Sequence, residues 1–154
     1  MSHSSPKEQR LLLIEKVLLL KSLSIFEETP ETVLAEVAEI LEEEEFEAGQ
    51  RIFNAGEVAN CMYIIFKGEV KIHAGDHTLA VLKENDFFGE LSLLDTETRS
   101  ASATVLGESL LLKINQEPFY ELMESRIEVA KGIIKTLCRR LRAQNVKSVQ
   151  QSNK

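Results

Sequence analysis

The stretch FFGELSLLDTETRSASATV, from Phe87 to Val105, carries the most specific pattern in the chain. Two aromatic residues precede Gly89, an apolar run long enough for one helical turn follows it, and Arg99 stands in front of small residues. The first N–H groups of a helical turn have no partners inside the helix and attract anions. A guanidinium binds phosphate through two parallel hydrogen bonds. We therefore predict that this turn and Arg99 form an anion site.

Glu90 narrows the class of ligand that such a site would accept. A carboxylate beside a bare phosphate would repel it, so Glu90 needs a hydrogen-bond donor, and a ribose hydroxyl would serve. Ser100 would add a hydroxyl and an N–H group, and the small side chains after it would let a ligand approach the backbone. The pattern favours a sugar phosphate. On spacing alone, a surface ion pair between Glu90 and Arg99, worth roughly 0–1 kcal/mol, also remains open.

Residues 49–114 contain short β-branched and aromatic runs separated by turn residues, which predicts an antiparallel β block. Gly56, Gly68 and Gly75 each fall at a predicted turn, where a positive φ costs glycine nothing. Asn85 is the turn residue that precedes the Phe87 stretch, and asparagine enters the left-handed region less easily than glycine.

Helical spacing of apolar residues flanks this block on both sides. Residues 6–48 are assigned to N-terminal helices, with the run EEEEFEAG as a solvated helix end and edge strand. Residues 115–147 are assigned to C-terminal helices, with Asn115 as an N-cap. The predicted order is helices, β-roll, helices in a single domain of residues 1–154, a length sufficient for one core.

The stretch resembles the phosphate-binding cassette of cyclic nucleotide-binding domains, whose pattern is approximately F-G-E-L/M-A-L-L/I-x-x-x-x-R-S/A/T-A. The match consists of residues 88–94 followed by residues 99–101. The segment EFEAGQRIFNAGEVANCMYIIFKGEVKIH also looks like the first strands of that family, and the likeness runs from about Leu12 to Arg142. Such an ordered series of matches is far more specific than one glycine motif.

The resemblance implies a mainly β fold with flanking helices: an antiparallel, jelly-roll-like β-roll or barrel, N-terminal helices, a cassette at residues 87–102, and C-terminal hinge and lid helices. It also implies a non-catalytic regulatory module that binds a cyclic nucleotide and needs no cofactor. Because Ser100 follows the arginine, as in cyclic AMP binders of the family, we expect cyclic AMP, with cyclic GMP as the alternative ligand.

The resemblance also implies a role for individual residues. Glu90 would accept from the ribose 2′-hydroxyl and Arg99 would hold the cyclic phosphate. The predicted phosphate clamp is completed by the turn at Gly89 and by the backbone N–H groups of Leu91, Ser92 and Ser100.

Outside the cassette the assignments are less specific. Ile72 aligns with an apolar position near the base, although an ordinary inward-facing strand residue explains it equally well. Gln144 and Asn145 are candidate base readers on the last helix. The sequence departs from the family pattern at Asn85, Thr96 and Thr98, which alters the accessible backbone conformations of the loop and puts its rigidity in question.

The last helix has two apolar faces, and each is predicted to pack against another element. One face forms an a/d seam in alternating steps of three and four, through Ile127, Ala130, Ile134, Leu137, Leu141, Gln144 and Ser148. The other face, with Val129, Ile133 and Leu137, would pack on the β-roll. In similar domains this helix closes over the base and pairs with a second subunit. The partner is therefore a second copy, an attached output domain in a longer protein, or an effector regulated in trans.

Bulk properties exclude several functions. A net charge of −7 gives no cationic field for nucleic acid, and no apolar run reaches the ~18 residues that a membrane span needs. Cys61 and Cys138 lack metal-type spacing, which favours reduced thiols in a cytoplasmic protein. His73 and His77 flank a turn and do not make a cupin-type metal centre, and no nucleophile with a base is recognisable. We therefore expect no metal and no enzyme activity.

One rival function remains. The chain could keep this fold as a protein-interaction domain that has lost its ligand. The presence of both Glu90 and Arg99 argues against that alternative, because a domain without a ligand has no need for an anion clamp.

Overall fold

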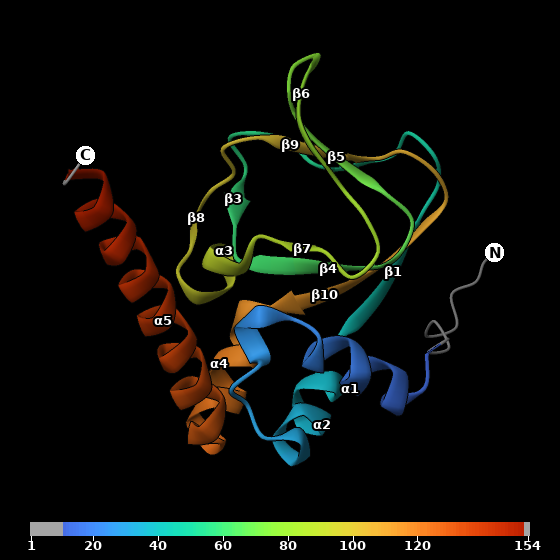
Figure 1. Cartoon of the computed structure of the whole chain (residues 1–154). Coiled ribbons are helices and arrows are strands. Elements are labelled where there is room, and N and C mark those ends of the chain that lie inside the picture. The colour runs from blue at the N-terminus through green and yellow to red at the C-terminus, as the bar shows by residue number, and fades with distance from the viewer. Residues whose placement is uncertain (1–10, 153–154) are drawn as a thin grey trace.

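The computed structural model describes residues 11–152. Figure 1 shows helices from both ends of the chain gathered on one side of an antiparallel roll, which confirms the predicted fold class. The helices are α1 (Leu13–Lys21), the 3-10 turn η1 (Ser24–Phe26), α2 (Glu31–Glu39), α3 (Glu90–Leu94), α4 (Gln116–Ser125) and α5 (Ile127–Ser152). The strands are β1 (Glu42–Phe46), β2 (Arg51–Phe53), β3 (Val58–Ala59), β4 (Cys61–Lys67), β5 (Val70–Ala74), β6 (His77–Leu82), β7 (Phe87–Phe88), β8 (Glu97–Thr98), β9 (Ser102–Val105) and β10 (Ser109–Asn115).

The strands form two four-stranded antiparallel sheets and one short pair. The first sheet has the order β1-β10-β4-β7, the second has the order β2-β9-β5-β6, and β3 pairs with β8. The β5–β6 hairpin turns at Gly75, which has a φ of +57°. The turn before β7 contains Asn85 in the left-handed region at a φ of +73°, as expected for a turn residue.

The first sheet begins at Glu42, whereas the β-roll was predicted to begin at residue 49 and residues 6–48 were predicted to be mainly helical. Glutamate has low strand propensity, so the acidic run is a weak strand signal. Basic groups from neighbouring elements compensate: Lys113 Nζ lies 3.6 Å from Glu44 Oε1, and the buried Lys16 Nζ lies 3.3 Å from Glu43 Oε2. The predicted edge strand is present, as β1 beside β10.

The N-terminal helical region is divided into short elements. Within the residues that were assigned to N-terminal helices, α1 begins at Leu13 and ends at Lys21, and the 3-10 turn η1 follows after a break. Residues 6–10 lie outside the described residues. Asn115 is the N-cap residue of α4, as predicted, although its side chain donates to Glu42 Oε1 instead of closing the helix start.

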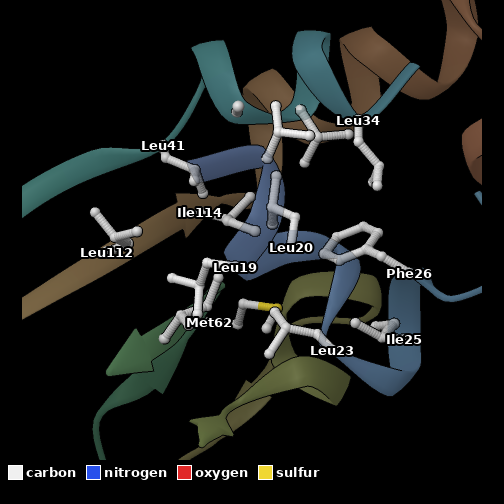
Figure 2. Close-up of a cluster of buried hydrophobic side chains, with 14 of the residues drawn as sticks. Leu19, Leu20, Leu23, Ile25, Phe26, Leu34, Leu41, Met62, Leu112 and Ile114 are labelled. Atoms are coloured by element: carbon white, nitrogen blue, oxygen red, sulfur yellow. The ribbon is translucent and has the colours of Figure 1, made fainter. Parts of the chain in front are cut away.

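Two hydrophobic clusters lie on opposite faces of the first sheet. Met62 and Ile64 on β4 join the larger cluster, which the helices cover and Figure 2 shows around Leu20 and Phe26. Tyr63 and its inward neighbours on β4 face the second sheet in the smaller cluster. Because both faces of β4 are covered, its sequence CMYII is continuously apolar rather than alternating.

The long helix α5 packs on the body through its first half and Arg140. Val129 and Ile133 are buried in the larger cluster, and Leu137 lies against it. The predicted inner face of the helix is therefore buried, but its main contacts are with η1 and α4 and not with the strands of the β-roll. Gly132 permits this approach, since a Cβ there would lie 2.8 Å from Thr29 Oγ1. Residues 141–149 are exposed, and Figure 1 shows α5 continuing away from α4. No helix within residues 11–152 is long and apolar enough to span a membrane.

Candidate functional site

Arg99 is held by its backbone and by the groups beneath its side chain. Its N–H donates to Glu57 O at 2.8 Å, and its carbonyl accepts from Gly56 N at 2.8 Å. The guanidinium carbon lies 4.1 Å from the centroid of the Phe53 ring, and Nη2 donates to Cys61 O at 3.2 Å. Among the described residues, no acceptor bonds Arg99 Nε or Nη1. The residue is therefore fixed while donors remain for an anion.

Gly89 allows the backbone to pass close to Arg99. Its φ is +82°, and a Cβ at this position would lie 2.7 Å from Arg99 Nη1 and 3.0 Å from Cys61 O. A side chain would therefore be strained by the backbone conformation and would also displace the arginine. The sharp turn predicted from the sequence is present at this residue.

The residues after Gly89 form the predicted short helical turn, α3. Leu93 N–H donates to Gly89 O at 3.2 Å, which is the first bond of the i to i−4 pattern. The N–H groups of Glu90, Leu91 and Ser92 come before that bond and have no acceptor within α3. These donors supply the partial positive charge expected at a helix start.

These groups surround a cavity of about 370 Å³, a volume in the range of small-molecule sites. The structure brings together seven of the nine predicted ligand-binding residues in its lining: Ile72, Gly89, Glu90, Leu91, Ser92, Arg99 and Ser100. Gln144 and Asn145 are not in the lining; they lie on the exposed second half of α5. The other lining residues are Phe53, Phe88, Glu97, Thr98 and Ala101.

Glu90 has a protein partner, but it is not Arg99. Arg140 Nη1 on α5 donates to Glu90 Oε1 at 2.8 Å, and Arg140 Nη2 lies 3.4 Å from Oε2. The structure records no ion pair between Glu90 and Arg99 among the residues it describes. Arg140 was not among the predicted site residues. It follows Leu137 by three residues and Ile133 by seven, so it lies on the same helix face, and this spacing was the signal that it faces the body.

Glu97 is a second carboxylate in the lining that the sequence analysis assigned to no role. Ser92 Oγ donates to Glu97 Oε1 at 3.3 Å, which connects the end of the loop to α3. No sequence signal identified it, because β8 is only two residues long and Glu97 falls among exposed polar loop residues.

Phe53 and Phe88 form the aromatic floor of the cavity and belong to a cluster that includes Tyr63. Phe53, Tyr63 and Phe88 have ring centroids 5.4–6.2 Å apart, and Tyr63 and Phe88 stack. Burial is the main cause that raises the pKa of Tyr63 above its usual value, and Cys61 and Glu44 nearby raise that pKa further.

The arrangement is chemically suited to an anion that also carries a hydroxyl group. Arg99 and the first N–H groups of α3 provide positive potential at one part of the cavity, and Glu90 provides an acceptor at another. Apolar surface from Ile72 and the aromatic floor would accommodate a flat ring. The described residues contain no group of three or more His, Cys, Asp or Glu side chains that could hold a metal ion.

Comparison with known proteins gives consistent matches. The sequence model of the family described as "Cyclic nucleotide-binding domain" matches residues 43–126, more than half of the chain. The chain is 29% identical over 126 residues to a CRP-like cAMP-activated global transcriptional regulator of Mycobacterium tuberculosis, covering 79% of this chain and 56% of that protein. It is 36% identical over 99 residues to the Cyclic AMP receptor protein of Thermus thermophilus, covering 61% of this chain and 46% of that protein.

A solved structure shows the same architecture over most of the chain. The N-terminal domain of a transcriptional regulator from Streptomyces coelicolor has a TM-score of 0.78 and 29% identity, covering 84% of this chain and 94% of that chain. In contrast, the chain spans only about half the length of the two curated relatives.

Proposed function

Because this chain belongs to the cyclic nucleotide-binding domain family, we propose that its cavity binds a cyclic nucleotide and releases it unchanged, so that the protein is a regulatory module and not an enzyme. The observation that carries this proposal is the convergence of Arg99, Glu90 and the start of α3 on one cavity. A cyclic nucleotide has a matching pair of features, a singly charged phosphodiester and a free ribose 2′-hydroxyl.

The proposed roles follow the positions of the lining residues. Arg99 would hold the cyclic phosphate with its unpaired N–H groups, and Glu90 would accept from the 2′-hydroxyl. Ile72 would contact the base from β5. The phosphate clamp would be completed by the turn at Gly89 and by the backbone N–H groups of Leu91, Ser92 and Ser100.

We propose cyclic AMP as the ligand and keep cyclic GMP as the alternative. The support comes from Ser100 after the arginine and from the names of the two relatives described above, which refer to cyclic AMP. A competition titration decides between them. Cyclic GMP binding at least tenfold tighter, a difference of about 1.4 kcal/mol, would reverse the choice.

The proposed output is a change in the position of α5. Gln144 and Asn145 lie outside the cavity lining, so they would read the base only if α5 moves toward the cavity. Ile134 and Leu141 are exposed on α5 and form part of the predicted a/d seam, which supports pairing with a second copy. An attached output domain remains the alternative, because the chain spans about half of the relatives' length.

We also propose that the protein is cytoplasmic and that residues 1–154 do not contact nucleic acid directly. The net charge of −7 supports the second proposal, because it gives no cationic field that would attract nucleic acid.

The ligand-free interaction domain has one observation in its favour. Glu90 is paired with Arg140, so its carboxylate is satisfied without a ligand. Arg99 differs, because its Nε and Nη1 groups have no acceptor in the part of the chain that the structure describes. A ligand-free domain would leave these donors without a function.

Isothermal titration calorimetry tests the proposal. We expect saturable heat with cyclic AMP, a loss of about 10- to 100-fold in affinity in Arg99→Lys, since charge-assisted bonds contribute roughly 1.5–3 kcal/mol, and no measurable heat in Arg99→Ala. Arg51→Ala, an exposed arginine on β2 that bonds Asn54, is the matched control and should bind normally. Absence of binding to both cyclic nucleotides by the unmodified protein would support the ligand-free alternative.

A further inference from the structure

Arg140 connects the last helix to two distant parts of the molecule. Its Nη1 donates to Glu90 Oε1 at 2.8 Å, and its Nη2 donates to Ser24 Oγ on η1 at 2.8 Å. Residues 141–149 beyond it are exposed. Arg140 therefore joins the middle of α5 to α3 and to η1.

The contact occupies the same carboxylate that the proposed function requires. The side chains of Glu90 and Arg140 are 23% and 37% exposed, so the pair is partly shielded from water. The guanidinium lies within 3.4 Å of both Glu90 oxygens, so it uses an acceptor site on each of them. A ribose hydroxyl is a neutral and weaker partner than a guanidinium.

We propose that Arg140 is an intramolecular competitor for Glu90, so that the cyclic nucleotide gains full hold of this carboxylate only when α5 releases it. The inference rests on the proposed function and deepens it by naming the residue through which α5 senses the ligand. The helix α5 would then have two positions: a latched state, in which Arg140 bonds Glu90, and a released state, in which it does not. A ligand that binds only the released state shifts the populations of the two states.

The position of Arg140 allows it to compete without filling the cavity. Arg140 is absent from the cavity lining. Its bond to Ser24 Oγ keeps the guanidinium on the η1 side of Glu90, where α5 and η1 pack together. Because the guanidinium contacts both Glu90 oxygens, a ribose hydroxyl that enters the cavity would have to share those oxygens with a charged donor. The two donors therefore compete for the hydrogen-bonding capacity of one carboxylate and not for the same space.

The test compares cyclic AMP with 2′-deoxy cyclic AMP in unmodified protein and in Arg140→Gln. We expect Arg140→Gln to bind cyclic AMP about three- to tenfold more tightly, as follows if the latched state holds roughly 70–90% of unliganded molecules. The affinity for 2′-deoxy cyclic AMP should stay unchanged, because that ligand has no 2′-hydroxyl to donate to Glu90. Ser24→Ala removes the second anchor of Arg140 and should tighten cyclic AMP binding in the same direction by a smaller factor.

Arg139→Gln is the matched control. Arg139 is the adjacent arginine of α5, and it pairs with Glu27 at 3.2 Å and Glu28 at 3.5 Å without touching Glu90. This variant also removes one positive charge and two ion pairs between α5 and the body. We expect its affinity for cyclic AMP to equal that of the unmodified protein.

Three results would overturn the inference while leaving the proposed function intact. These are unchanged or weaker cyclic AMP binding in Arg140→Gln, an equal gain for both ligands, and an equal gain in Arg139→Gln. The last two would mean that α5 shields the cavity as a whole. Failure of the unmodified protein to bind any cyclic nucleotide would overturn both the proposed function and the inference, so the two failures are distinguishable.

Discussion

The guanidinium carbon of Arg99 lies 4.1 Å from the centroid of the Phe53 ring, stacked on the aromatic floor of the cavity. This contact uses the face of the guanidinium and leaves the N–H groups of Nε and Nη1 available, whereas a carboxylate partner would occupy them. The structure thus orients a phosphate-binding group before any phosphate arrives, and it does so without a competing negative charge on that group.

Replacing Phe53 with leucine should weaken cyclic AMP binding by about three- to tenfold. The cation–π contact contributes roughly 0.5–1 kcal/mol at a partly exposed site, and Arg99 would also lose its fixed orientation. Calorimetry measures the affinity. Phe46→Leu is the control, because Phe46 packs on the same cluster but does not line this cavity. Equal losses in both variants would show that the cluster matters only for packing.

Gly89→Ala should both destabilise the protein and weaken cyclic AMP binding by tenfold or more. The added Cβ would lie 2.7 Å from Arg99 Nη1, and the left-handed backbone costs a non-glycine residue roughly 1–2 kcal/mol. Gly75→Ala separates the two effects, since Gly75 has a φ of +57° and no atom within 4 Å of its virtual Cβ. Urea unfolding should show losses in both variants, whereas only Gly89→Ala should lose affinity. Normal affinity in Gly89→Ala would contradict the proposed close approach.

The stability of the protein should fall as the pH rises above about 10 through the buried phenol of Tyr63. Burial raises the pKa of this hydroxyl in the folded state, while the unfolded chain titrates near its usual value of about 10. Above that pH the unfolded state releases a proton that the folded state keeps, so the unfolding free energy decreases by up to about 1.4 kcal/mol per pH unit. Tyr63→Phe keeps the ring and lacks the proton. Urea unfolding at pH 8 and pH 11 should show a smaller decrease for this variant, and equal decreases would contradict the assignment.

The exposed seam of α5 predicts concentration-dependent dimerisation. Ile134 is 58% exposed and Leu141 is 61% exposed, and burial of such side chains against a second copy would be favourable. Analytical ultracentrifugation should detect a dimer that Ile134→Glu and Leu141→Glu convert to monomer. Leu79→Glu is the control, because Leu79 is a comparably exposed apolar residue on β6 and should leave the dimer intact. A monomer at all concentrations would exclude this seam as a homodimer interface.

The elements that short-range patterns control could be predicted from the sequence. The glycine turn at Gly89, the helical turn after it and the left-handed Asn85 each follow from local residue types, and all three are present. The β1 strand was harder, because its glutamates have low strand propensity and are compensated by Lys113 and Lys16 from elsewhere in the chain. Local rules contain no information about such partners.

The same distinction applies to the candidate site. The cassette residues are close in sequence, so their convergence on one cavity could be anticipated from the motif. The pairing of Glu90 with Arg140 joins residues 50 positions apart and depends on how α5 packs against η1. Phe53 was missed for a similar reason, because its position under Arg99 is set by the pairing of β2 with β9.

A ¹⁵N-labelled NMR titration with cyclic AMP tests most directly whether the nucleotide binds in the cavity at Arg99. We expect saturable shifts of the backbone amides of Leu91, Ser92 and Ser100 and of the Arg99 side-chain N–H signals, all with one dissociation constant. Saturable binding whose shifts instead gather around the hollow formed by Glu45, Lys67 and Glu108, with the signals of the cavity unchanged, would contradict this expectation.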